Sequence, residues 1–272
     1  MAAKEPLRVA IAGLGAIGLP VARALDDGIE GLTLVAVSAR DREKAAAKLG
    51  SLATLPPVVS LPELAEVADV VVESIPAASF AEVAEPAVEK GRIFMPLSVG
   101  VLLTRMDLVD RARETGARII CPTGALLGLD AVRAAAEGDL ASVTMLTRKP
   151  PRGLKGAPHI EAEGIDLDAI VEPTLVFKGS AREAAKGFPA NINVGAALSL
   201  AGIGPDRTEI EIWADPTVSR NTHRINVDGD ASRFEMRIEG IPTEENPATG
   251  KLTPLSVIAT LRGLTSPLKV GT

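Results

Sequence analysis

The sequence predicts an α/β protein: a doubly wound parallel sheet in the N-terminal half, followed by a second α+β domain on a mostly antiparallel sheet. Up to residue 123, short apolar runs alternate with helical stretches, the pattern of strand–helix–strand units. Beyond it, strand-like runs follow one another, and a turn at 228–230 predicts a hairpin. We therefore expect domains at 1–123 and 124–246, with a C-terminal helix within 247–272 completing the first.

The first predicted strand, 7–12, runs directly into a glycine motif. Gly13-Leu14-Gly15-Ala16-Ile17-Gly18 separates it from a helical stretch. Gly-x-Gly-x-x-Gly between a strand and a helix is the dinucleotide fingerprint of the Rossmann fold. Its glycines should supply, in order, a tight turn, close approach of the backbone to a pyrophosphate, and close helix–strand packing. We expect NAD or NADP to bind here, contacted by Gly13, Gly15, Ala16, Ile17 and Gly18. A glycine-rich turn without a ligand is the alternative.

The end of the second predicted strand, 32–37, bears on the choice between the two cofactors. A site that prefers NAD usually has Asp or Glu there to bind the ribose hydroxyls. This chain has Ser38, Ala39 and Arg40 instead, followed by Asp41. Ser38 and Arg40 are suited to a 2′-phosphate, so we expect NADP to be accepted alongside NAD. An arginine that is simply solvated at a strand end is the alternative.

The alternation continues along the N-terminal half. It predicts helices at 41–49, 63–68, 78–90 and 105–115, and strands at 58–59, 69–74, 92–98 and 117–121. Residues that directly follow parallel strands line the cleft in which a cofactor lies, so Ser74 is a further candidate contact. Glu73 is expected to hydrogen-bond loop groups and to have no catalytic part.

The second half has a different pattern. It predicts helices at 131–137 and 247–263, and strands at 141–148, 175–177, 208–213, 222–227 and 233–239. Residues 149–158 are rich in Pro, Gly and Lys and predict an exposed, mobile loop. The small and apolar run 194–202 predicts a helix that packs its backbone close against another surface. Asn191 and Asn193 lie at or before its start, where an amide can cap the helix or point into a cleft.

The chain has two histidines, and they receive different interpretations. His159, beside the loop, is expected to be a solvated surface residue. His223 lies at the start of a predicted strand among polar neighbours, and imidazole titrates near neutrality. It is therefore the candidate general acid/base, with a structural histidine as the alternative. Arginines near it in sequence could neutralise an anionic substrate, but the sequence does not select among Arg220, Arg224 and Arg233.

Composition excludes several classes of function. The formal net charge of −6 argues against a nucleic-acid partner, which would require a basic surface. The single cysteine, Cys121, excludes an intramolecular disulfide and a Cys-rich metal site, and we expect it to be a buried small hydrophobe. No run reaches the roughly 20 apolar residues of a membrane span. We expect a cytoplasmic protein without a metal.

Several motifs together resemble the L-aspartate dehydrogenase family, in which a Rossmann domain precedes an α+β catalytic domain. They are residues 124–130 (GALLGLD), 188–194 (FPANINV), 221–223 (NTH) and 245–247 (ENP). By that resemblance, Ala125 and Asn191 match cofactor-contacting positions of the family, and His223 matches its catalytic histidine. The chain departs from the family at 38–40 and 74–76, which affects cofactor preference and the local shape of the cleft.

The resemblance implies NAD(P)-dependent oxidative deamination of L-aspartate. The α-hydrogen would leave as hydride, and water would convert the resulting iminoaspartate into oxaloacetate and ammonia, with His223 as the base that activates the water. Arginines, backbone amides and the helix near Asn191 would bind the two carboxylates. In this family the imine can also feed NAD biosynthesis.

A homodimer is expected, because an antiparallel sheet in a small domain often leaves one face uncovered. Two other functions fit the same architecture. One is a reductase or dehydrogenase of the dihydrodipicolinate reductase or homoserine dehydrogenase type. The other is an NADP-binding sensor without turnover, although such a sensor has no need of the polar Asn191 and His223.

Overall fold

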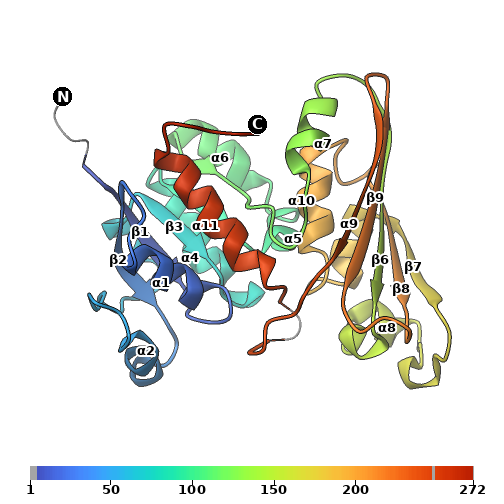
Figure 1. The fold of residues 1–272 in the computed structure, drawn as a ribbon, viewed down its shortest axis with the longest axis horizontal. Helices are drawn as coiled ribbons and strands as arrows, with labels where there is room; N and C mark the ends of the chain where they lie inside the picture. The colour runs from blue at the N-terminus through green and yellow to red at the C-terminus, as the bar shows by residue number, and fades with distance from the viewer. Residues whose placement is uncertain (1–4, 247–248, 272) are drawn as a thin grey trace. The chain divides into compact units, whose positions relative to one another are not determined.

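The computed structural model describes residues 5–246 and 249–271, and the chain divides into two compact units. One unit comprises Met1–Gly124 and Thr253–Lys269, and the other comprises Ala125–Leu252 and Val270–Thr272. Figure 1 shows the elements of both. Among the described helices, none has the length and apolar character needed to cross a bilayer.

The first unit is built on a parallel sheet with the strand order β2-β1-β3-β4-β5. Its strands are β1 (Leu7–Ala12), β2 (Leu32–Ser38), β3 (Val70–Glu73), β4 (Ile93–Pro96) and β5 (Arg118–Ile119). Because β2 and β3 flank β1 on opposite sides, the strand order reverses at β1. In open parallel sheets, ligands bind at this point, beyond the carboxyl ends of the strands. The predicted doubly wound parallel sheet is confirmed.

Helices cover both faces of this sheet. Val9 and Ile11 of β1 contribute to one apolar cluster, while Ala10 and Ala12 contribute to another, as alternation along a strand requires. The first cluster includes residues of α1 (Gly18–Asp26), α2 (Arg42–Leu49) and α11 (Leu252–Thr265). The second includes residues of α3 (Leu64–Val67), α4 (Phe80–Glu89), α5 (Val99–Leu102) and α6 (Asp107–Thr115).

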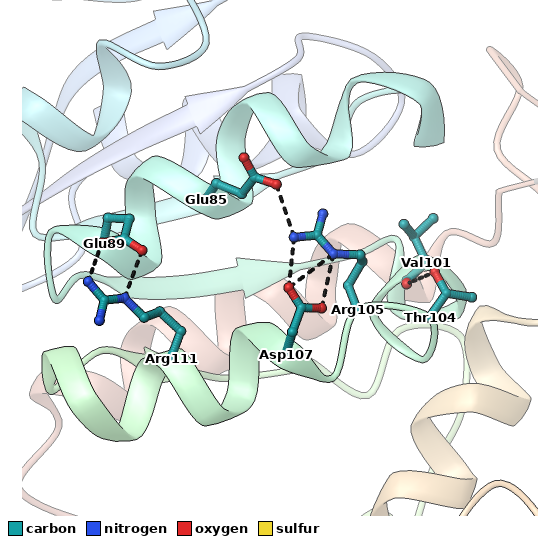
Figure 2. Close-up of polar contacts among 7 residues, drawn as sticks. All are labelled: Glu85, Glu89, Val101, Thr104, Arg105, Asp107 and Arg111. Atoms are coloured by element: carbon teal, nitrogen blue, oxygen red, sulfur yellow. Dashed lines mark hydrogen bonds and ion pairs between the residues drawn. The ribbon is translucent and has the colours of Figure 1, made fainter.

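Helices α4 and α6 are joined at the surface by ion pairs (Figure 2). The Arg105 guanidinium bonds Glu85 and Asp107, and the Arg111 guanidinium bonds Glu89. These side chains are about half exposed, and pairs of this kind contribute roughly 0–1 kcal/mol each. The buried contacts beneath them contribute more. The rings of Phe80 and Phe94, for example, meet edge to face with centroids 5.7 Å apart.

The second unit is built on a mixed sheet with the order β10-β9-β6-β8-β7. Its strands are β6 (Leu140–Lys149), β7 (Thr174–Ser180), β8 (Glu209–Ala214), β9 (Thr222–Gly229) and β10 (Arg233–Glu239). Strands β6 and β8 pair in parallel, and the other three pairs are antiparallel, which confirms the predicted mostly antiparallel sheet. The helices of this unit are α7 (Leu129–Ala135), α8 (Pro158–Ala162), α9 (Ala181–Gly187) and α10 (Asn193–Ala201).

Helix α10 packs its backbone against the inner face of this sheet, as its small residues predict. A Cβ added at Gly195 would lie 2.9 Å from Met145 Cε and 3.1 Å from Ile210 Cδ1. These atoms are the ends of flexible side chains, so a larger residue at 195 would require them to move. Glycine at 195 allows the helix to lie close to β6 and β8.

Two predicted segments, the loop at 149–158 and the strand at 58–59, are wrong. Residues 149–158 are not an exposed loop: Lys149 ends β6 and is buried, Leu154 is fully buried in a 3-10 turn, and α8 begins at Pro158. The strand at 58–59 is only an isolated bridge between Val58 and Val37. Pro56 and Pro57, which precede it, have no N–H to extend a ladder.

The C-terminal helix is shorter than the predicted 247–263. Residues 247 and 248 lie outside the described part of the chain, and α11 begins only at Leu252. Before it, Pro242 and Gly250 form an antiparallel bridge, and the Lys251 amide donates to the Ile241 carbonyl. These bonds hold residues 249–251 in an extended turn instead of a helix.

Two single residues also bear on the predictions. His159 is half-buried rather than solvated, because its ring packs against Phe177 and Phe188 and its Nε2 lies 3.0 Å from the Val176 carbonyl oxygen. Cys121 packs beside the apolar cluster under α4, and burial raises the pKa of its thiol to about 12. The thiol is thus protonated and unreactive at neutral pH.

Candidate active site

The glycine turn after β1 is held in a conformation that only glycine permits at two of its positions. Gly13 has φ +92°, and a Cβ there would lie 2.6 Å from the Ser74 carbonyl oxygen. A Cβ at Gly18 would lie 1.9 Å from the Gly13 carbonyl oxygen. The Gly13 amide donates to the Ser38 carbonyl at 2.8 Å, which fixes the turn against the end of β2. These contacts account for the first and third glycines of the motif.

The second glycine faces open space. No atom lies within 4 Å of the position that a Cβ would take at Gly15, and the residue is exposed. Ala16 and Ile17 follow, half-buried, and α1 begins at Gly18 with no side chain capping its N-terminus. An open glycine backbone before uncapped helix amides is the arrangement that binds a pyrophosphate. The turn therefore fits a dinucleotide.

Two polar residues at the end of β3 organise the neighbouring loops. The Ser74 hydroxyl contacts the Ala12 carbonyl at 2.9 Å and the Gly13 carbonyl at 3.3 Å. The fully buried Glu73 carboxyl accepts hydrogen bonds from the amides of Ile75, Leu97 and Ser98 and from the Ser98 hydroxyl. Burial raises the pKa of Glu73, against the effect of these four donors. The expected loop-bonding role of Glu73 is confirmed.

The end of β2 presents one cation without a carboxylate partner. Ser38 is buried, whereas Arg40 is exposed and forms no ion pair within residues 5–246 and 249–271. Asp41 is turned away, since its carboxylate accepts from the Lys44 amide at the start of α2. From the same helix, the Lys48 ammonium donates to the Leu14 carbonyl in the glycine turn at 2.8 Å.

In the second unit, alternate residues of β6 and β9 point to the buried face of the sheet, and the polar ones lie at one end of it. Residues 143, 145, 147 and 149 of β6 are buried, as are 223, 225 and 227 of β9. Most of them are Val, Ile or Met, but Thr147, Lys149 and His223 are polar. Thr147 and His223 are directly opposite each other in the antiparallel register, and Thr147 Oγ1 lies 3.0 Å from His223 Nδ1.

Asn191, just before α10, joins this group. Its Oδ1 accepts a 2.5 Å hydrogen bond from the Lys149 ammonium, and the N-cap position of α10 is Ile192. Asn191 is therefore not the helix cap. Burial lowers the pKa of Lys149 to about 8. Burial and the positive charge of Lys149 together lower the pKa of His223 to about 3, so its imidazole is neutral at neutral pH.

The arginines considered from the sequence do not belong to this group. Arg224 lies on the opposite face of β9 and pairs with Glu235, and Arg233 pairs with Asp228. Arg220 is exposed in the turn before β9. Ala125, the remaining sequence candidate, is half-buried in the turn that follows Gly124, before α7.

The sequence interpretation missed Lys149 and Thr147. The signal was present, because the buried alternation Val143, Met145, Thr147 extends to residue 149 if the strand is continued by one residue. The described part of the chain holds no cluster of three His, Cys, Asp or Glu side chains able to bind a metal ion.

The fold and the site define a class of protein. A family model described as the NAD-binding domain of homoserine dehydrogenase matches residues 13–122, and one described as the C-terminal domain of aspartate dehydrogenase matches residues 130–264. The chain is thus an oxidoreductase with an N-terminal NAD(P)-binding domain.

Curated relatives define the family. The L-aspartate dehydrogenase of Bradyrhizobium diazoefficiens is 58% identical over 270 residues, covering 99% of this chain and 96% of the relative. L-aspartate dehydrogenase 3 of Bordetella bronchiseptica is 51% identical, with both chains fully covered. The chain belongs to the L-aspartate dehydrogenase family.

Solved structures agree with this assignment. The aspartate dehydrogenase of Thermotoga maritima has a TM-score of 0.71 at 25% identity, over 97% of this chain and 99% of that one. A homoserine dehydrogenase from Thiobacillus denitrificans has a TM-score of 0.62 at 16% identity, over 96% of this chain and 73% of that one, and shares the fold.

Proposed function

We propose that this protein oxidises L-aspartate with NAD or NADP, giving iminoaspartate, which water converts into oxaloacetate and ammonia. The observation that carries the proposal is the buried pair of His223 and Thr147 beside Lys149, in a chain 58% identical to a named L-aspartate dehydrogenase. A neutral imidazole and a cation are what a dicarboxylate undergoing proton and hydride transfer requires.

The glycine turn would hold the cofactor, whose nicotinamide accepts a hydride. Its open backbone at Gly15 and the uncapped start of α1 support binding of the pyrophosphate by residues 13 and 15–18. Arg40, which lacks an ion-pair partner among the described residues, is suited to a 2′-phosphate, with Ser38 beside it. Ser74, Ala125 and Asn191 are proposed as further contacts, the last two from the family resemblance.

His223 is proposed as the catalytic base. Its low pKa keeps the imidazole unprotonated at neutral pH, so Nε2 is able to accept a proton from the water that attacks the imine. Thr147 bonds Nδ1 and thereby holds the ring in one orientation. An approaching dicarboxylate would raise the basicity of the imidazole, because a nearby anion favours the charged form.

Assembly and cellular role are further parts of this proposal. A homodimer is supported by the outer face of the second sheet, where Leu146, Arg148 and Trp213 are only half-buried. A supply of iminoaspartate to NAD biosynthesis stays a prediction from the family resemblance. A cytoplasmic location stays a prediction from the sequence.

Turnover is tested by following the absorbance of reduced nicotinamide with L-aspartate and NAD or NADP, in the wild type and in His223→Ala. We expect turnover in the wild type and loss of at least about 100-fold in the variant, while NADPH binding persists. L-homoserine is tested in parallel, because its oxidation would favour the alternative of a homoserine dehydrogenase. Cofactor binding without turnover in either direction would support a sensor and contradict the proposal.

A further inference from the structure

Lys149 is a buried ammonium with an unusual set of partners. Only 6% of the surface of Lys149 is exposed, and its ammonium donates a 2.5 Å hydrogen bond to the Asn191 amide oxygen. No carboxylate within residues 5–246 and 249–271 forms an ion pair with it. An ammonium has three donors, and burying one without an anion costs free energy. The fold therefore maintains a desolvated positive charge that an amide alone stabilises.

Among the described residues, the elements packed around Lys149 supply no anion that faces its ammonium. The titratable group nearest to it on β9 is the neutral His223. Thr147 on β6 and Asn191, just before α10, supply a hydroxyl and an amide. The 3-10 turn Pro151–Leu154, which contacts Lys149 through Gly153, carries only the exposed cation Arg152. The inward residues of β8 are apolar: Ile210, Ile212 and Ala214.

The carboxylate nearest in the chain already has partners. The Asp215 amide donates to the Lys149 carbonyl at 2.8 Å, which places this aspartate beside the end of β6. Its carboxylate accepts from Arg148 at 3.1 Å and from the amide and hydroxyl of Thr217 at 2.8 and 2.6 Å. Burial acts to raise the pKa of Asp215, but these bonds outweigh it and lower the pKa. Asp215 thus neutralises Arg148 and not Lys149.

We propose that Lys149 binds one carboxylate of the substrate, with Asn191 as the residue that positions the ammonium. This inference deepens and rests on the proposed function. Each of the three nearby arginines already has a carboxylate partner: Arg148, Arg224 and Arg233. Lys149 has none among the described residues, and its positive charge lies beside His223, the candidate base. A carboxylate on Lys149 completes the ammonium's hydrogen bonds and places the substrate next to His223.

The test measures binding of succinate, a dicarboxylate that cannot be oxidised at a C–N bond, to the complex with NADH by calorimetry. Lys149→Met removes the charge and keeps the length of the side chain, and we expect about 100-fold weaker binding and a similar rise in KM for L-aspartate. Lys149→Arg keeps a charge and should retain affinity within about 10-fold. Lys155→Met is the matched control at an exposed lysine and should leave affinity unchanged.

The pH dependence provides a readout independent of turnover. Only the ammonium binds a carboxylate, so succinate affinity of the wild type should fall up to tenfold per pH unit above about pH 8. His223 stays neutral across that range and does not contribute. Lys149→Met should show no such fall. This difference holds even if arginine proves too large for the site.

The two carboxylates of the substrate are distinguished with L-asparagine, which lacks the side-chain carboxylate. If Lys149 binds that group, Lys149→Met loses the preference for L-aspartate over L-asparagine. If Lys149 binds the α-carboxylate, turnover of both amino acids falls equally. Both results support the proposal.

Four results would overturn it. They are succinate affinity equal in wild type and Lys149→Met, affinity of the wild type that is flat above pH 8, equal affinity loss in Lys149→Met and the Lys155→Met control, and no succinate binding by the wild type at millimolar concentration. A wild type that binds succinate through Lys149 but does not oxidise L-aspartate would refute only the proposed function.

Discussion

His223 and Thr147 are opposite each other on the antiparallel strands β9 and β6, and their side chains meet, with 3.0 Å between Nδ1 and Oγ1. Both side chains are buried. A hydroxyl is able to donate to or accept from Nδ1, so the contact fixes the imidazole ring in either tautomer. In the proposed mechanism, Nε2 is then the nitrogen that accepts the proton.

Replacing Thr147 tests the importance of this contact. Thr147→Val keeps the shape and removes the hydroxyl, and we expect kcat for L-aspartate to fall roughly 5-fold, the equivalent of one hydrogen bond worth about 1 kcal/mol. Thr147→Ser keeps the hydroxyl and should retain most of the activity. Equal kcat in the valine variant and the wild type would show that the ring is oriented by packing alone.

The pKa of His223 predicts a contribution to acid denaturation. Its value in the folded state, about 3, is below the ordinary 6.5, so the unfolded chain binds more protons between these two pH values. The free energy of unfolding therefore falls as pH drops through 6.5, with a slope of up to about 1.4 kcal/mol per pH unit.

Urea denaturation at pH 7 and pH 5 measures this contribution. Wild type should lose more stability over the interval than His223→Gln, by up to about 2 kcal/mol, because the variant lacks the titrating group. An equal loss in both proteins would mean that the imidazole is accessible to protons in the folded state.

The sequence predicts the first unit well because its information is local. The inner strands β1 and β3 are buried on both faces over most of their length and form apolar runs, and the glycine motif follows β1 directly. The small residues of α10 were equally informative, since they allow close packing against Met145 and Ile210. These features are visible without knowledge of what lies opposite.

The errors concern residues whose surroundings are distant in sequence. Lys149 stands before two prolines, and its neighbours in sequence predict a loop, although it occupies an inward position of β6. The environment of His159 consists of Phe177 and Phe188, which nothing in its own neighbourhood reveals. Both predictions rested on the composition of the neighbouring sequence, whereas the environment of each residue is set by tertiary contacts.

Two glycines of the turn after β1 should have different roles, Gly18 in stability and Gly15 in cofactor binding. Gly18→Ala places a Cβ 1.9 Å from the Gly13 carbonyl oxygen, so we expect it to lower the melting temperature by several degrees, as about 2 kcal/mol of strain would. Gly15→Ala meets no atom within 4 Å and should leave the melting temperature unchanged.

Fluorescence titration with NADH separates the effects on binding. Gly15→Ala should weaken NADH binding about 10-fold, because its methyl group occupies the space through which the pyrophosphate approaches. Unchanged affinity in this variant would place the pyrophosphate elsewhere.

Arg40 should determine the preference between NADP and NAD. We expect Arg40→Ser to weaken NADPH binding about 10-fold, the usual scale for losing a charged hydrogen bond, and to change NADH binding less than about twofold. Arg118→Ser, an exposed arginine on the opposite edge strand β5, is the control for net charge. A parallel loss for both cofactors would show that Arg40 does not contact the 2′-phosphate.

Glu73 should be important for stability at the carboxyl edge of the first sheet. Its carboxyl oxygens accept from three backbone amides, which belong to Ile75, Leu97 and Ser98. Glu73→Gln turns one acceptor into a donor that faces amide donors, so we expect a loss of about 2–3 kcal/mol in the free energy of unfolding.

Glu63→Gln is the matched control for this substitution. Glu63 also accepts from a backbone amide and a hydroxyl, both of Ser60, but at an exposed position where water replaces a lost bond. We expect a loss below about 0.5 kcal/mol, measured by urea denaturation. Similar losses in the two variants would mean that burial adds nothing to the hydrogen bonds of Glu73. In that case the loops after β3 and β4 would be held by packing and not by this carboxyl group.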